Sequence, residues 1–161
     1  MCGISCVIGL NEKLNDKNDI SNLHSCISHR GPDSCNYTLL ERVHLAHHRL
    51  AIIDLKRESD QPFNINNELF IIFNGEIYNH IEIREKLKKE GIKFRTESDT
   101  EVILNSYKFW GKECIKKFNG MWSFVIFNLN KNEIFCSRDR FGIKPFYYIK
   151  INQKIYIASE L

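Results

Sequence analysis

The chain opens with Met1-Cys2-Gly3-Ile4-Ser5-Cys6-Val7-Ile8-Gly9, the stretch that decides how the remainder is interpreted. Residues 4–8 form a short apolar run closed by Gly9, which is typical of a buried strand. Cys2 precedes this run and follows a methionine that an aminopeptidase can remove. The exposed α-amine, with a reference pKa of roughly 7.7–8.0, could then take the thiol proton near neutral pH. Cys2 is therefore either a self-activating nucleophile or an ordinary small residue that begins a strand.

The composition predicts one domain that binds neither nucleic acid nor membranes. With 161 residues and 43% hydrophobic content, the chain can bury a substantial single core. The net charge is only +3, and the 23 basic residues are scattered. The sequence has no signal pattern and no apolar run near the ~18 residues of a membrane span. We therefore expect a cytoplasmic protein.

The six cysteines indicate reduced thiols, most of them buried and structural. There is no Cys-x-x-Cys pair, and the histidines at 44, 47 and 48 do not match a zinc spacing. On a strand, His47 would point away from the other two, so the three cannot ligate one ion. We expect no metal site.

Hydrophobic periodicity predicts an α+β fold of two antiparallel sheets packed face to face, with helices outside. Short connections between the later strands require antiparallel neighbours. Asp19 is a candidate helix cap, Gly91 a helix-ending residue, and Ser98 with Glu101 a capping box. We expect strands at 4–8, 37–40, 43–54, 69–73, 121–128, 133–137, 146–151 and 154–158, and helices near 19–27, 79–90, 98–110 and 114–118.

Asn74 and Gly75 follow the continuous apolar strand 69–73. Asn-Gly is a common hairpin turn and would stop this strand sharply. The same pair could supply an amide donor and an unobstructed backbone N–H, the composition of an oxyanion hole for acyl transfer.

Two charged residues are candidates for binding a free amino acid. Arg49 lies in an apolar strand, where its planar fork suits a carboxylate, although an internal ion pair with Asp54 or Glu76 would also explain it. Asp99 either receives an ammonium group or simply favours a helix dipole. The segment 29–33 is a substrate lid or a turn, and Asp139 is expected to form salt bridges with Arg138 and Arg140.

The ordered series of motifs resembles the glutaminase domain of glutamine-hydrolysing asparagine synthetases, a class II glutamine amidotransferase with the N-terminal nucleophile fold. The resemblance covers nearly the whole chain. It rests on Met1-Cys2-Gly3-Ile4, His29-Arg30-Gly31-Pro32-Asp33, Ala46-His47-His48-Arg49-Leu50, Gln61-Pro62, Asn74-Gly75-Glu76-Ile77-Tyr78-Asn79, Ser98-Asp99-Thr100-Glu101, Gly120-Met121 and Arg138-Asp139-Arg140-Phe141-Gly142-Ile143-Lys144-Pro145.

This resemblance implies a four-layer αββα sandwich and a role for each matching residue. Cys2 would be the nucleophile, and Asn74 with Gly75 would form the oxyanion hole. Arg49 would bind the α-carboxylate of glutamine, while Glu76 and Asp99 would receive its α-ammonium.

The sequence departs from the family pattern at Cys6, Asn36, Asp60 and Asn128, none of them expected at the site. Asn36 is expected to preserve a turn.

The family continues into an ATP-binding synthetase domain, and no pyrophosphate loop occurs within residues 1–161. We expect a separately made domain, a split subunit or a truncated gene product. Glutamine and a synthetase domain or subunit are the expected partners, a homodimer is an open alternative, and ATP with Mg²⁺ is expected only in the synthetase domain. An amidohydrolase for another amide, an amidotransferase serving another acceptor and a non-catalytic binding module are the rival interpretations.

Overall fold

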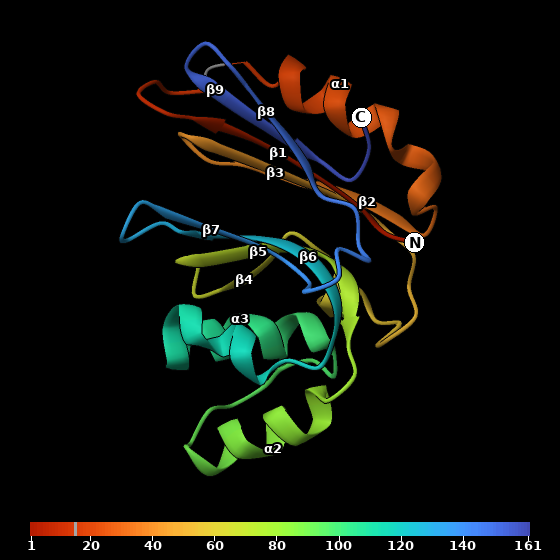
Figure 1. Ribbon diagram of the computed structural model, residues 1–161, viewed down its shortest axis with the longest axis vertical. Coiled ribbons are helices and arrows are strands. Elements are labelled where there is room, and N and C mark those ends of the chain that lie inside the picture. Colours follow the sequence, from red (N-terminus) through yellow and green to blue (C-terminus); the bar gives the residue numbers. More distant parts are fainter. Residues whose placement is uncertain (15) are drawn as a thin grey trace.

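The computed structural model describes residues 1–14 and 16–161 as two antiparallel sheets packed face to face (Figure 1). Sheet A contains, in spatial order, β2 (Ser34–Leu39), β3 (Val43–Arg49), β1 (Gly3–Gly9), β9 (Lys154–Ala158) and β8 (Tyr147–Ile151). Sheet B contains β4 (Phe63–Ile65), β5 (Leu69–Ile77), β6 (Gly120–Asn128) and β7 (Glu133–Arg138).

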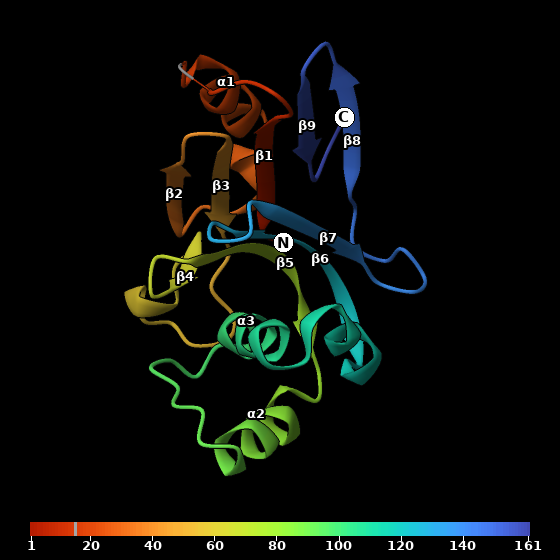
Figure 2. The ribbon, with the colours of Figure 1, turned by 90° about the vertical axis from the view of Figure 1, so that its left-hand side faces the viewer.

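Helices cover the outer face of each sheet (Figure 2). The α-helices are α1 (Asn18–Cys26) over sheet A, and α2 (His80–Lys89) and α3 (Asp99–Trp110) beyond sheet B. Three 3-10 helices span Ser28–Arg30, Arg57–Ser59 and Gly111–Lys117. The expected αββα sandwich is confirmed, and no helix in the described ranges is long and apolar enough to span a membrane.

The side chains of β5 alternate between the two main cores. Phe70 and Ile72 pack against sheet A, whereas Ile71 and Phe73 pack against α2 and α3. Because successive strand residues point to opposite faces, a continuous apolar strand needs cover on both sides. The apolar run 69–73 therefore identifies β5 as a strand between two buried layers.

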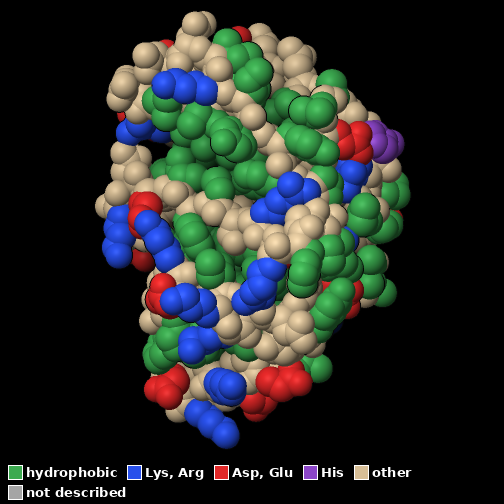
Figure 3. All heavy atoms as spheres, in the orientation of Figure 1, with side chains coloured by type: hydrophobic (Ala, Val, Ile, Leu, Met, Phe, Trp, Pro, Cys, Tyr) green, Lys and Arg blue, Asp and Glu red, His purple; other side chains and the backbone are tan. Residues whose placement is uncertain are grey.

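The outer surface differs between the two ends of the molecule (Figure 3). Hydrophobic side chains gather over the sheet A end, where Tyr148 and Ile149 of the edge strand β8 are exposed. Charged side chains dominate the opposite end, over α2, which carries Lys86, Lys88 and Lys89 in its last turn. The α2 end is therefore the more strongly solvated one.

Helix boundaries follow the predicted signals with two differences. Gly91 follows α2 at φ 85°, and Ser98 Oγ caps α3 by accepting the N–H of Glu101 at 3.3 Å. The Glu101 carboxylate does not complete the capping box, because it accepts from Thr96 and Arg95 instead. The second difference concerns α1, in which Asp19 lies in the first turn and Lys17 holds the cap position. In α2 the buried face carries Ile83, while Ile81 is 62% exposed.

Three strand predictions were wrong at their ends. β3 stops at Arg49 and does not reach residue 54. β5 continues through Asn74 and Gly75 to Ile77, so this pair is not a turn. Asn36 lies inside β2, opposite His47, where no turn exists.

Candidate active site

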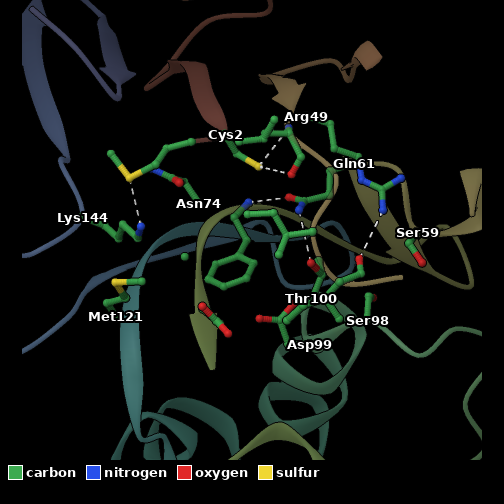
Figure 4. A pocket seen from close by; sticks show the side chains of 17 residues that line it. Cys2, Arg49, Ser59, Gln61, Asn74, Ser98, Asp99, Thr100, Met121 and Lys144 are labelled. Atoms are coloured by element: carbon green, nitrogen blue, oxygen red, sulfur yellow. Dashed lines mark hydrogen bonds between the residues drawn. The ribbon is translucent and has the colours of Figure 1, made fainter. Parts of the chain in front are cut away.

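All six residues singled out from the sequence line one cavity of about 280 Å³ (Figure 4). Figure 4 shows Cys2 and Arg49 along one side, and Ser98, Asp99 and Thr100, at the start of α3, along the other. The remaining members lie on β5, and the predicted set is Cys2, Arg49, Asn74, Gly75, Glu76 and Asp99. Residues from both sheets and one helix therefore meet in one cavity.

The thiol of Cys2 is held by the backbone that follows β3. The Leu50 N–H donates to Sγ at 3.3 Å, and Sγ lies 3.5 Å from the Leu50 carbonyl. Burial raises the pKa of the Cys2 thiol, and the Leu50 N–H, the N-terminal charge and Arg49 only partly offset this effect. Because the resting thiol is neutral, attack on a substrate requires a base.

The segment 29–33, predicted as a substrate lid or a turn, contacts the backbone of Cys2, and none of its residues is among those that line the cavity. Arg30 Nε donates to the Cys2 carbonyl at 3.0 Å, while its Nη1 is paired with Glu160 at 2.6 Å. Gly31 has no room for a side chain, because an added Cβ would lie 2.4 Å from the carbonyl carbon of His48. These contacts fix the position of the Cys2 backbone.

The amide of Asn74 is one of two buried polar groups of the cavity that lack a partner among the described residues, and Ser59 Oγ is the other. Asn74 is 2% exposed, and its Nδ2 has no hydrogen-bond partner among the described residues. Buried amide groups are normally paired, because an unmade hydrogen bond costs free energy. An unpaired donor beside a thiol is the arrangement expected of an oxyanion hole.

Gly75 is required by close packing and not by a turn. An added Cβ would lie 2.3 Å from the Met121 carbonyl oxygen and 2.8 Å from Trp122 Cα on β6. Gly75 pairs with Trp122 in the ladder, so the neighbouring strand leaves no space. The sequence signal was real, but its physical cause is the approach of two backbones.

Gln61 and His47, which sequence reasoning left without a role, hold β5 in place. Gln61 accepts the Phe73 N–H at 2.6 Å and donates to Thr100 Oγ1 at 3.2 Å. His47 Nε2 lies 3.2 Å from the Phe73 carbonyl, and burial lowers the pKa of His47 to about 3. A neutral imidazole thus donates to that carbonyl and links the two sheets.

Arg49 has its predicted acidic partner, but it is neither Asp54 nor Glu76. Its Nη1 is paired with Asp60 Oδ1 at 2.6 Å and also donates to the Lys56 carbonyl at 3.0 Å. Its Nη2 donates to the Asp54 carbonyl. Asp60, which was expected outside the site, is not among the residues that line the cavity, but its carboxylate already occupies part of the guanidinium fork of Arg49.

Asp99 lies at the opposite side of the cavity, in the first turn of α3. Its Oδ2 accepts the Ile77 N–H at 3.0 Å, and it is 5% exposed. Burial raises the pKa of Asp99, and the hydrogen bond from Ile77 only partly offsets the effect. Arg84 of α2 fixes the preceding loop by donating to the carbonyls of Thr96 and Ser98 at 2.6 and 2.9 Å.

Lys144 was missed as a residue of this cavity. It is 6% exposed, and its Nζ lies 3.1 Å from Met1 Sδ. The only sequence signal for it was the segment 138–145.

The prediction of salt bridges between Asp139 and its neighbouring arginines was wrong, because Asp139 accepts backbone N–H groups, among them those of Ile143 and Lys144, both at 2.9 Å. Those bonds lower the pKa of Asp139 although burial opposes it.

The fold and the cavity together define the class of this protein. A cysteine directly before the first strand of an αββα sandwich, in one cavity with an unpaired amide donor, is the arrangement of an N-terminal nucleophile amidotransferase. The model of the glutamine amidotransferase domain matches residues 1–161. The chain belongs to this family.

Two curated relatives are asparagine synthetases. The chain is 43% identical to "Asparagine synthetase [glutamine-hydrolyzing] 1" of Bacillus subtilis, over 99% of the chain and 26% of that protein. It is 39% identical to "Putative asparagine synthetase [glutamine-hydrolyzing] 2" of Methanocaldococcus jannaschii, over 100% of the chain and 34% of that protein. The chain therefore spans about a quarter to a third of the length of these relatives.

A solved structure shares the fold. Glutamine phosphoribosylpyrophosphate amidotransferase from B. subtilis superposes with a TM-score of 0.81 and 21% identity. The match covers 99% of this chain and 42% of that one. This likeness shows that the two chains share the two-sheet fold.

Proposed function

We propose that this chain hydrolyses the side-chain amide of glutamine to glutamate and ammonia. The observation that supports it most is the unpaired Asn74 amide in the same cavity as the buried Cys2 thiol. Arg49 and Asp99 on opposite sides supply a cation and an acid for the two charged groups of a free amino acid. Glu76 lines the cavity as a second acid for the α-ammonium.

Before any catalysis, hydrolytic removal of Met1 converts the amide nitrogen of Cys2 into a free amine. This amine takes the thiol proton, and the thiolate sulfur attacks the amide carbon of glutamine. Asn74 and Gly75 donate hydrogen bonds to the oxyanion. The leaving nitrogen receives the proton and departs as ammonia, and water then cleaves the thioester to release glutamate. None of these steps uses a cofactor.

The test is glutamate release by the chain with a processed N-terminus, verified by mass spectrometry. Cys2→Ala should abolish release and leave the fold intact by circular dichroism. Cys26→Ala is the matched control, because Cys26 is an exposed thiol at the end of α1 and should retain activity. Near-normal activity in Cys2→Ala would refute the nucleophile, whereas an inactive processed wild type would favour a non-catalytic glutamine-binding or partner-binding module.

We further propose that the ammonia serves ATP-dependent asparagine synthesis from aspartate on a synthetase domain or subunit. The relatives named as asparagine synthetases support this acceptor. ATP and Mg²⁺ would be used there, and the cytoplasm, which keeps thiols reduced, suits the nucleophile.

The 161-residue chain alone should give no pyrophosphate from aspartate, ATP and Mg²⁺. Asparagine formed after adding a separate synthetase domain would support a split enzyme. Ammonia used only with another acceptor would favour a different amidotransferase, and light scattering would show whether a homodimer forms.

A further inference from the structure

A second cluster of chemically reactive side chains lies under α1, on the outer face of sheet A. It brings together His24 of α1, Cys35 of β2 and His48 of β3. One ligand atom from each lies within 4.8 Å of the other two, and His24 Nε2 is 3.1 Å from Cys35 Sγ. These three residues line a cavity of about 310 Å³ whose lining shares no residue with the Cys2 cavity.

The backbone of β3 explains this separation. His47 and His48 are consecutive strand residues, so their side chains point to opposite faces of sheet A. His47 reaches Phe73 on sheet B, while His48 Nε2 reaches the His24 carbonyl at 2.9 Å. The argument against a site made from His44, His47 and His48 therefore does not apply to a cluster that uses only one of them.

Both imidazoles have one nitrogen anchored and the other available. Since a carbonyl only accepts, His48 Nε2 carries the proton, and its Nδ1 keeps a lone pair. His24 Nδ1 lies 3.5 Å from Ser5 Oγ, which leaves Nε2 facing the Cys35 thiol. Metal-binding histidines usually donate their second N–H to such an outer partner, which fixes the tautomer and orientation of the ring.

We propose that His24, Cys35 and His48 form a zinc-binding site, distinct from the glutamine cavity. Imidazole nitrogen with thiolate sulfur is a donor set that suits Zn²⁺, at about 2.0–2.1 Å from nitrogen and 2.3 Å from sulfur. Binding releases the thiol proton of Cys35 to solvent. Among the described residues no Asp, Glu, Lys or Arg lines this cavity, so the ion and the thiolate would be the charges that this lining holds.

The geometry requires one local movement and leaves one open position. The two imidazoles are stacked, with centroids 3.8 Å apart and planes at 23°. Ring lone pairs lie in the ring plane, so one imidazole must tilt out of the stack to share an ion with the other. Cys35 is exposed, and water can supply the fourth ligand from that side. A bound ion would tie α1 to the β2–β3 hairpin.

Cobalt(II) is the probe that tests this site, because it replaces zinc and reports its ligands by colour. We would titrate it into the Cys2→Ala chain, which removes a competing thiol. One equivalent should give visible tetrahedral bands and a thiolate charge-transfer band, and Zn²⁺ should displace it. Cys35→Ser should eliminate the charge-transfer band and weaken binding at least tenfold. Cys26→Ser, which changes another exposed thiol at the end of α1, should change neither.

Two histidine variants test the other two ligands of the proposed zinc site. His48→Gln and His24→Gln should each weaken Co²⁺ binding at least tenfold, with folding checked by circular dichroism. If either variant unfolds, Cys35→Ser carries the test, because that side chain is exposed. A charge-transfer band that survives in Cys35→Ser, or an absence of saturable binding to the Cys2→Ala chain, would overturn the site. Neither result bears on glutamine hydrolysis.

Discussion

The two sides of the Cys2 cavity are built differently. On sheet B, Asn74 and Gly75 lie inside a strand that pairs with β6 along its whole length. On sheet A, Cys2 precedes the first strand residue and Arg49 is the last residue of β3, so both lie at the ends of their strands. The sheet B side therefore has its geometry fixed by the fold, whereas the sheet A side depends on individual hydrogen bonds. Substitutions on the two sides should therefore change stability and catalysis differently.

Gly75→Ala should have the largest effect and should damage both fold and catalysis. The added methyl group would meet backbone atoms of β6, and overpacking of this kind costs about 1–3 kcal/mol. Displacing the strand also moves the oxyanion donors, so kcat should fall by more than the ~10²–10³ typical of losing one donor. Urea unfolding and single-turnover glutaminase assays measure the two effects. Normal stability together with normal kcat would mean that β5 is not held rigidly.

Asn74→Ala should damage catalysis alone. Its Nδ2 has no partner within residues 1–14 and 16–161, so its loss removes no hydrogen bond seen in the folded state, yet kcat should fall by roughly 10²–10³ with KM little changed. Asn105→Ala is the matched control, because Asn105 of α3 also has a buried, unpaired Nδ2 but does not line the cavity. Equal kinetic losses in the two variants would contradict an oxyanion role for Asn74.

Arg49→Lys tests the sheet A side of the cavity. A lysine offers one point charge in place of a planar fork, so kcat/KM should fall several-fold or more. The loss should largely disappear with a glutamine analogue whose α-carboxylate is an amide. If both substrates lose the same factor, Arg49 serves the fold and not the substrate.

Asp60→Asn should have a smaller effect in the opposite direction. The paired carboxylate neutralises Arg49, so its replacement by a neutral side chain of the same shape should lower KM several-fold with kcat unchanged. Glu58→Gln removes a nearby exposed acid that forms no ion pair with Arg49 within the described ranges and should leave KM unchanged. A raised KM in Asp60→Asn would show that the ion pair positions Arg49 for the substrate.

Asp99→Asn probes the smallest expected effect, on stability. Burial raises the pKa of Asp99 in the folded state, so ionisation of this group opposes folding. Its contribution is therefore most favourable below the ordinary pKa of an aspartate and declines as pH rises through the raised value. Asp99→Asn should gain stability over wild type across that window, measured by thermal unfolding against pH. A pH-independent difference would mean that Asp99 does not titrate upward.

Sequence reasoning predicted the layers and the members of the cavity because their signals are local. The apolar run at 69–73 and the helix signals at Gly91 and Ser98 depend on neighbours along the chain, and the family motifs pointed to the cavity residues. It failed where partners come from distant segments. The Arg49–Asp60 pair, the Gln61 link to Phe73 and the placement of Lys144 beside Met1 follow only from the folded arrangement. The His24–Cys35–His48 cluster was missed for the same reason, since three elements contribute one residue each.

The pairing of β1 with β9 has a consequence for biosynthesis. The first strand made by the ribosome has one of its two neighbours among the last residues of the sequence, Lys154–Ala158. At roughly 5–20 residues per second, about 7–30 seconds separate their emergence. During that interval β1, the central strand of sheet A, lacks one of its two neighbours, so the sheet is incomplete. The order of synthesis thus leaves an aminopeptidase time to remove Met1 before sheet A is complete.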